Sequence, residues 1–497
     1  MAQSPYRSFV ARLVSNYIFG SVVAVLGVGG AILSGSLSVP RGELLHLQAI
    51  LLLSLITMFT AEYFAFRRHM APIRDLFRSA RPALAQIEAA YLRAHRLPSL
   101  AVARTLGPHL VGLSLPASAM ALLAIRLGWA DLPYYYIGLA AAGAVLVACM
   151  HALIEFFLTA QAIRPLLVHL RALGRGMYGA DISLHGRVLV SIQRKFQLSA
   201  FLIGTFPVIL FSLATQIRLN GWSRDLGYDY WSWAGLILVT GVGFSSLGAW
   251  LLGRDVQQPI RELYEAMSEV QAGRLQTSAS DLYSDEFAQL TAGFNGMVDG
   301  LRSRERTNAQ LLQSYYATLA AALDARDAYT AGHSQRVAEY SAVIGRAAGL
   351  SADELDVLNK SALLHDIGKI GVRDSVLLKD GKLTEEEFEQ IKQHPVLGEG
   401  ILLQVEPREA LAPLLPGVRS HHERYDGGGY PDGLRGEDIP ATGRIIAVAD
   451  AFDAMTSDRP YRRGMPVHKA LAILEEGRGT QWDAAYVELF VSRMRGE

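Results

Sequence analysis

The chain has almost no cysteine, and neither sign of charge predominates. Its single cysteine, Cys149, lies in an apolar stretch, which excludes a disulfide framework and a cluster of metal-binding thiolates. Basic and acidic residues both number 47, so net charge indicates neither a nucleic-acid partner nor an acidic tail. From about Asp324 onward, no alternating strand pattern of useful length is present, which predicts an all-helical C-terminal domain.

Long apolar runs occupy the chain before residue 255. Each of six runs is long enough to cross a bilayer as a helix, for which about 20 residues suffice; they are Tyr17–Leu37, Leu47–Phe66, His109–Ile125, Tyr135–Leu158, Gln197–Ile217 and Trp231–Leu252. No small-residue cleavage site cleanly follows the first run, so we do not expect a signal peptide. Arginine and lysine concentrate in residues 67–108 and 160–196, which predicts an inner-membrane protein with both termini in the cytoplasm.

An internal repeat links three prolines in this half. Glu62-Tyr63-Phe64 and Glu155-Phe156-Phe157 each begin ten residues before a proline, Pro72 and Pro165, and Pro259 follows 94 residues after Pro165. We predict three tandem units, each a helical hairpin followed by a helix that begins at the proline, where a missing N–H does no harm. Chance similarity among apolar segments is the alternative.

His151 and Glu155 lie four residues apart in the fourth run and therefore share a helical face. Ionisable groups in a span are candidates for function. Both residues lie toward the cytoplasmic end, where such groups are more easily accommodated, so we favour an interfacial or helix-packing role over a sensing role.

Residues 255–310 predict two amphipathic helices joined by an extended connector. The pattern consists of Pro259, Gly273 after the first helix, Asp285-Glu286 at the start of the second, and Phe294-Asn295-Gly296-Met297. It resembles a HAMP linker, and the resemblance implies a parallel four-helix bundle in a homodimer. A helical hairpin lying on the membrane is the alternative.

Five histidines and two aspartates form the sharpest signal, between residues 333 and 450. They are His333, His365, Asp366, His394, His421, His422 and Asp450. Imidazoles with carboxylates suit first-row transition metals better than calcium. Seven such side chains are too many for one ion, whereas two neighbouring ions can hold the attacking and leaving oxygens of a phosphoryl centre. The set therefore predicts a two-metal phosphoesterase.

These residues lie in motifs that resemble a known family. His365-Asp366-Ile367-Gly368-Lys369 resembles the HD motif of metal-dependent phosphohydrolases, and residues 421–431 are similar to the signature of the HD-GYP family. Residues 327–333 and 457–462 also match that family. The resemblance covers roughly residues 321–491. It implies a bacterial cyclic di-GMP phosphodiesterase.

The resemblance also implies roles for individual residues. The seven histidines and aspartates become ligands of two divalent transition-metal ions, iron or manganese, with Asp366 as the bridge. Lys369 faces the scissile phosphate, and the residues implied to contact substrate are Lys369, Gly428, Tyr430, Asp453, Arg459 and Arg462. Tyr329 stands where some members carry a glutamate, so a third ion stays open.

We therefore predict an all-α, multi-pass signalling enzyme that hydrolyses cyclic di-GMP to pGpG, or onward to GMP, by a two-metal hydroxide mechanism. Its expected partners are the bilayer and a second copy joined through the HAMP segment, with no nucleic acid. The predicted domains are a membrane region, a HAMP linker, a connecting helix and a catalytic domain, at residues 1–254, 255–310, 311–323 and 324–497. The alternatives are a hydrolase of another cyclic nucleotide or dinucleotide, and a catalytically silent receptor for a nucleotide or a protein.

Overall fold

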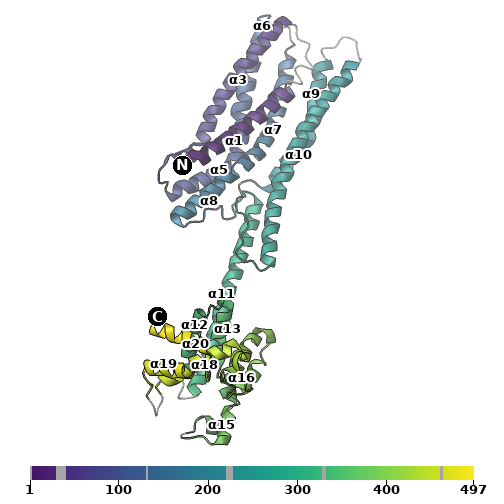
Figure 1. Cartoon of the computed structure of the whole chain (residues 1–497). Coiled ribbons are helices and arrows are strands. Elements are labelled where there is room, and N and C mark those ends of the chain that lie inside the picture. Colours follow the sequence, from purple (N-terminus) through teal and green to yellow (C-terminus); the bar gives the residue numbers. More distant parts are fainter. Residues whose placement is uncertain are drawn as a thin grey trace. The chain divides into compact units, whose positions relative to one another are not determined.

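The computed structural model describes residues 3–29, 41–129, 133–219, 228–326, 332–379, 381–458 and 463–496. Across these ranges, the regular structure is helical, apart from one isolated bridge between Arg478 and Trp482. The predicted all-α class is therefore confirmed. The chain divides into two compact units, Met1–Arg302 and Ser303–Glu497 (Figure 1).

The first unit contains six helical stretches that are long and apolar enough to cross a membrane, as the sequence predicts. They are α1 (Gln3–Ser21) with η1 (Val22–Gly29), α3 (Arg41–His69), α5 (Leu84–Arg104) with η2 (Thr105–His109) and α6 (Leu110–Arg126), α7 (Tyr135–Ala162), α9 (Ile192–Leu219) and α10 (Tyr228–Gln271). The end of the first predicted run, beyond residue 29, lies outside the described residues.

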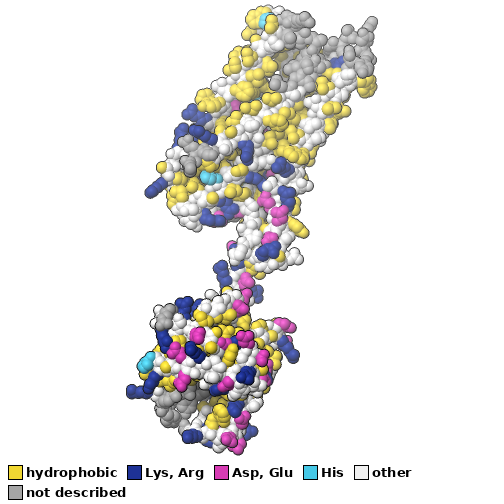
Figure 2. Space-filling model, in the orientation of Figure 1, with side chains coloured by type: hydrophobic (Ala, Val, Ile, Leu, Met, Phe, Trp, Pro, Cys, Tyr) yellow, Lys and Arg dark blue, Asp and Glu magenta, His cyan; other side chains and the backbone are white. Residues whose placement is uncertain are grey.

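The outer surface of these helices is strongly apolar (Figure 2). Large side chains such as Phe64, Leu115, Val208 and Val239 are each at least 63% exposed. A continuous apolar surface of this kind suits contact with lipid rather than with water. Lysine and arginine side chains gather at the end of the unit where α8 (Arg164–Tyr178) lies, which agrees with their uneven distribution in the sequence.

The three prolines of the internal repeat do not behave alike. Pro72 and Pro165 lie in the first turns of α4 (Ala71–Arg78) and α8, as predicted. Pro259 instead lies inside α10, so the prediction that a helix begins there is wrong. Proline removes one main-chain donor, but Leu251 before it and Ala266 after it are both buried, and this packing keeps the helix continuous.

The connector after α10 is bound to the segment that precedes α9. The main-chain N–H of Leu189 donates to the carbonyl oxygen of Ser284 at 2.7 Å, and that of Ile192 donates to Oε2 of Glu286 at 2.6 Å. Nζ of Lys195 lies 2.6 Å from Asp285 and 2.9 Å from Asp255. The acidic pair that begins α11 (Glu286–Arg326) therefore also holds the start of α9.

The second unit consists of the C-terminal part of α11 and a set of short helices around one main core. They are α12 (His333–Ala347), α13 (Ala352–Leu364), η3 (Ile367–Gly371), α14 (Asp374–Leu377), α15 (Glu385–Ile391), α16 (His394–Leu402), η4 (Arg408–Ala410), η5 (Ala412–Leu414), α17 (Leu415–Ser420), η6 (Gly436–Asp438), α18 (Ala441–Thr456), α19 (Val467–Glu476) and α20 (Ala484–Arg495). Ser351 and Thr384 each begin a helix with a capping box. The rings of Phe452 and Phe490, 4.9 Å apart, lie in the core and join α18 to α20.

A buried ion pair in the first unit yields a stability prediction. Nε of Arg104 lies 2.7 Å from Oε1 of Glu62, and the two side chains are 6% and 7% exposed. We expect Arg104→Leu to lower the free energy of unfolding by about 3–5 kcal/mol, because Glu62 is left buried without its cation. Thermal unfolding of the purified chain in detergent measures this loss. The double variant Arg104→Leu, Glu62→Leu should recover much of it, and a double variant no more stable than the single one would contradict the explanation.

Candidate metal centre

All seven predicted metal ligands lie in the second unit, six of them at helix ends or directly after them and Asp450 within a helix. His333 begins α12, and His365 and Asp366 follow α13. His394 begins α16, while His421 and His422 follow α17 and Asp450 lies in α18. Both α13 and α17 end directly before a ligand, so the ends of these helices determine where their ligands lie.

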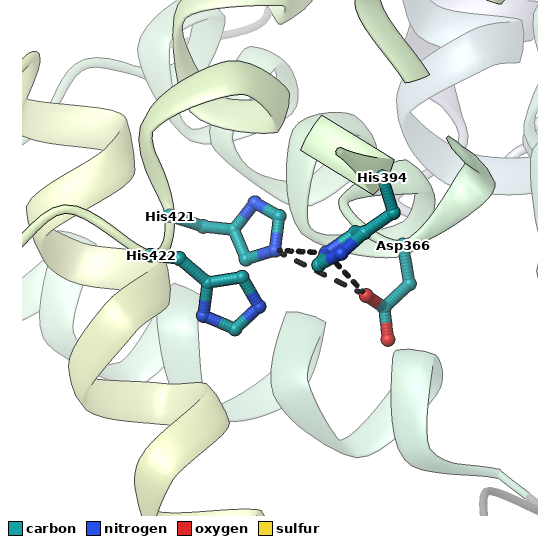
Figure 3. A group of neighbouring side chains, drawn as sticks. All are labelled: Asp366, His394, His421 and His422. Atoms are coloured by element: carbon teal, nitrogen blue, oxygen red, sulfur yellow. Dashed lines mark hydrogen bonds and ion pairs between the residues drawn. The ribbon is translucent and has the colours of Figure 1, made fainter. Parts of the chain in front are cut away.

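The two oxygens of Asp366 face different histidines. Oδ1 lies 3.2 Å from Nε2 of His394 and 4.0 Å from Nε2 of His421. Oδ2 lies 3.4 Å from Nε2 of His365 and 3.8 Å from Nε2 of His333. Figure 3 shows the first of these groups, with His422 beside His421. Asp366 is thus shared by two groups of possible ligands, one with His394, His421 and His422 and one with His333 and His365.

Main-chain carbonyl groups orient three of the imidazoles. Nδ1 of His365, His394 and His421 lies 2.7–2.8 Å from the carbonyl oxygen three residues earlier in the chain. A carbonyl oxygen only accepts, so Nδ1 carries the proton and Nε2 keeps its lone pair for a metal ion. Nε2 of His365 is buried and has no hydrogen-bond partner among the residues that the structure describes. This donor set fits a metal ion.

His333 is held differently, by two aspartates of α18. Its Nδ1 lies 2.8 Å from Oδ2 of Asp453, and its Nε2 lies 3.3 Å from Oδ1 of Asp450. Arg336, three residues after His333, binds both oxygens of Asp453 at 2.6 and 3.0 Å. Asp453 is 1% exposed, and its observed contacts orient His333. Its predicted contact with substrate stays a prediction.

The protonation states of the ligands differ within the site. Burial lowers the pKa of His365 and His421, and it lowers the pKa of His422 to about 4, so all three are neutral near pH 7. Burial opposes charge on His333 too, but its hydrogen bonds to Asp450 and Asp453 outweigh burial and raise its pKa to about 10. Although Asp366 is buried, the Lys369 ammonium keeps its pKa well below the usual value.

Lys369 lies directly beside the bridging carboxylate. It belongs to η3, and its Nζ is 2.6 Å from Oδ2 of Asp366. One residue earlier, Gly368 packs against α16 so closely that an added Cβ would lie 1.8 Å from the carbonyl oxygen of His394. The HD motif therefore needs glycine at this position, because any side chain would push His394 away.

The loop after His422 is closed by its own side chains. Both oxygens of Glu423 accept main-chain N–H groups, from Asp432 at 2.7 Å and from Leu434 at 3.1 Å. The ring of Tyr430 lies 4.9 Å from that of His422, so this predicted substrate contact borders the ligand cluster. Gly428 is exposed and donates its N–H to Asp426 at 2.9 Å. Arg459, Arg462 and Tyr329 lie outside the described residues.

Sequence reasoning did not identify Arg326, the last residue of α11. Its guanidinium donates to the carbonyl oxygens of Lys369, Ile370 and Val372 at 2.9–3.0 Å and pairs with Asp374. It therefore fixes the main chain of η3. Arg326 directly precedes the matched stretch that begins at Asp327, and this is its only sequence signal.

Comparisons with known proteins agree with this geometry. Residues 317–486 match the family model described as HD domain, and residues 251–303 match the model described as HAMP domain. The second unit therefore carries an HD domain, which is a metal-dependent phosphohydrolase fold, and a HAMP domain precedes it. The predicted resemblance to both families is confirmed.

Three curated relatives match part of the chain. A 3'3'-cGAMP-specific phosphodiesterase 3 from Vibrio cholerae is 46% identical over 161 residues, 32% of this chain and 34% of the relative. The cyclic di-GMP phosphodiesterase response regulator RpfG from Xanthomonas campestris is 45% identical, over 34% of this chain and 45% of the relative. A cyclic di-GMP phosphodiesterase from Vibrio cholerae is 34% identical, over 49% of this chain and 52% of the relative. The chain spans about a third to a half of the length of these relatives.

The protonation state of His333 predicts a pH dependence of metal binding. A ligand imidazole must be neutral, whereas His333 with a pKa of about 10 carries a proton at neutral pH. We expect the affinity for Mn²⁺ to rise about tenfold per pH unit between about pH 6 and 8, as one proton is released per site. Calorimetric titration in two buffers of different protonation enthalpy counts that proton. Asp453→Asn should flatten the slope, and a pH-independent affinity of the unsubstituted chain would contradict the assignment.

The close packing of Gly368 predicts a loss of bound metal in Gly368→Ala. The added methyl group must displace α16, and overpacking of this kind costs about 1–3 kcal/mol or more. We expect fewer metal ions per chain by elemental analysis, with the helical circular dichroism signal retained. Gly400→Ala is the matched control, because a Cβ at Gly400 in the same helix meets nothing within 4 Å. Equal metal content in both variants would contradict this account.

Proposed function

We propose that this chain is a membrane-bound, metal-dependent phosphodiesterase that hydrolyses cyclic di-GMP to pGpG. The observation that carries the proposal is the Asp366 carboxylate, whose two oxygens face two separate groups of histidines within an HD domain. The relatives named cyclic di-GMP phosphodiesterases support the choice of substrate.

Two divalent ions held by the seven ligands would activate water and neutralise the charge that develops on the phosphoryl oxygens. Iron and manganese both suit this set of nitrogen and oxygen donors. Asp366 would contribute a ligand to each of the two groups. Asp450 joins the group of His333, whose Nε2 it contacts at 3.3 Å.

The remaining side chains bind and orient the substrate. Lys369 contacts Asp366 at 2.6 Å, so its ammonium lies where it can move to a phosphate oxygen once the carboxylate is neutralised by cations. Tyr430 presents an aromatic face at the edge of the histidine cluster, a surface on which a guanine base can stack. Gly428, Asp453, Arg459 and Arg462 complete the proposed substrate contacts.

The first unit supports a membrane location. Its six candidate spans and the following HAMP domain suit a multi-pass protein of the bacterial inner membrane, with both termini in the cytoplasm. We propose a homodimer joined through the HAMP domain. We also propose that the domains end at residues 254, 310 and 323, as the sequence predicts.

A second candidate substrate is 3'3'-cGAMP. One relative that is 46% identical over 161 residues carries that specificity in its name. Both molecules are cyclic dinucleotides with two phosphodiester bonds, so the same metal centre serves either one, and only the base-binding surface distinguishes them.

Turnover by the purified full-length chain with Mn²⁺ or Fe²⁺ tests the proposal. We expect cyclic di-GMP to be cleaved with a higher kcat/KM than 3'3'-cGAMP, with pGpG appearing first by chromatography. The double variant His365→Ala, Asp366→Ala should lose activity by about 10²-fold or more, because it removes stabilisation of charge in the transition state. His468→Ala, an exposed histidine outside the cluster, is the control and should keep full activity.

Unchanged turnover in the double variant would exclude this centre as the active site. Tight binding of cyclic di-GMP without cleavage would show a receptor instead, and a higher kcat/KM for 3'3'-cGAMP would replace the substrate while keeping the chemistry.

A further inference from the structure

A second group of histidines and carboxylates is buried inside the helix bundle of the first unit. His109 of η2 is 3% exposed, and His151 and Glu155 of α7 are each 1% exposed. Both side chains of the α7 pair are therefore buried among the helices of the bundle, and their role stays a prediction. The rings of His109 and His151 lie close to Tyr17 of α1, and His151 and Glu155 lie near Gly20 of the same helix.

The charges of this group do not balance. Arg104 binds Glu62 at 2.7 Å, so that carboxylate has its cation. Glu155 accepts only a long hydrogen bond from Thr159, at 3.4 Å, and its Oε2 is buried without a partner among the residues that the structure describes. A buried carboxylate without a close cation is strongly unfavourable, so Glu155 must be neutralised either by a proton or by a bound cation.

Two atoms of this group lack a hydrogen-bond partner among the described residues, and the His109 ring lies beside them. Tyr17 Oη lies 2.8 Å from Nδ1 of His109, so Nε2 is the ring nitrogen that a cation would use. Nε2 of His151 is buried and unpartnered within the described part of the chain. Gly20 packs closely against it, since an added Cβ there would lie 2.8 Å from that nitrogen and 3.8 Å from Oε2 of Glu155, so both donor atoms point toward the same glycine.

The two imidazoles are arranged like those of the HD centre. The ring centroids of His109 and His151 lie 5.1 Å apart, with an angle of 72° between the ring planes. The corresponding values are 5.0 Å and 82° for His394 and His422, and 5.3 Å and 61° for His333 and His365. Two histidines and a glutamate form a common ligand set for zinc and related ions.

We propose that His109, His151 and Glu155 form a binding site for a divalent transition-metal ion inside the membrane region. The site is separate from the HD centre and does not depend on the phosphodiesterase proposal. Its three donors do not all lie within 4.8 Å of one another, as those of the HD centre do. Binding therefore draws these side chains inward and links the ion to the packing of α1, η2 and α7.

Co²⁺ is the probe, because its visible absorption reports nitrogen and oxygen ligation directly. The full-length variant His365→Ala, Asp366→Ala, His394→Ala, His421→Ala leaves each group of the HD centre with too few ligands to compete. In detergent, after treatment with a chelator, we expect this variant to bind one Co²⁺ per chain with a tetrahedral visible spectrum. Adding Glu155→Gln, which keeps the size of the side chain, or His151→Leu should abolish the spectrum and the bound metal.

His95→Leu in the same background is the matched control. His95 is also buried, at 3% exposure, and its Nε2 is also unpartnered within the described residues, but its ring packs against Tyr91. This variant should keep the Co²⁺ spectrum. Failure of the background chain to bind Co²⁺, or equal binding after Glu155→Gln, would overturn the proposal. Gel filtration in detergent shows that each variant is folded, so loss of binding is not mistaken for unfolding.

Discussion

The carboxylate of Asp366 is shared by two groups of imidazoles, and much of the second unit serves to hold it in that position. Its oxygens lie 3.2 and 3.4 Å from the nearest ring nitrogens on either side. Main-chain carbonyl groups orient three of the rings, and Asp453 orients a fourth. Gly368 allows α16 to approach closely enough for His394 to reach the carboxylate. A two-ion centre requires all of these constraints together, because each ion needs several ligands at fixed distances.

The sequence pointed to side chains that lie close together in the structure, because their residue types and motifs are specific. It also predicted six apolar spans and the start of α11, each of which depends on local sequence. It could not predict that Pro259 lies inside a helix, since packing of Leu251 and Ala266 decides that outcome. The contact between Asp453 and His333 joins residues 120 positions apart, and no local pattern reveals such a pair.

Both units contain ionisable groups in an apolar interior, where their charges must be compensated. In the second unit, the histidines and aspartates compensate one another, and Lys369 supplies a further positive charge. In the first unit, Arg104 compensates Glu62 but leaves Glu155 without a cation. In the connector, the Lys195 ammonium pairs with Asp285, and the main-chain N–H of Ile192 at the start of α9 donates to Glu286.

Arg326 gives the end of α11 a second role. Its three hydrogen bonds to carbonyl oxygens tie the last turn of a 41-residue helix to the main chain of Lys369, only three residues from the shared carboxylate. A rotation of that turn would pull on the main chain that carries Lys369. A fragment that begins at Asp327 would keep all seven proposed metal ligands but lose the hydrogen bonds of Arg326. Arg326 therefore connects α11 to the main chain beside the proposed metal centre.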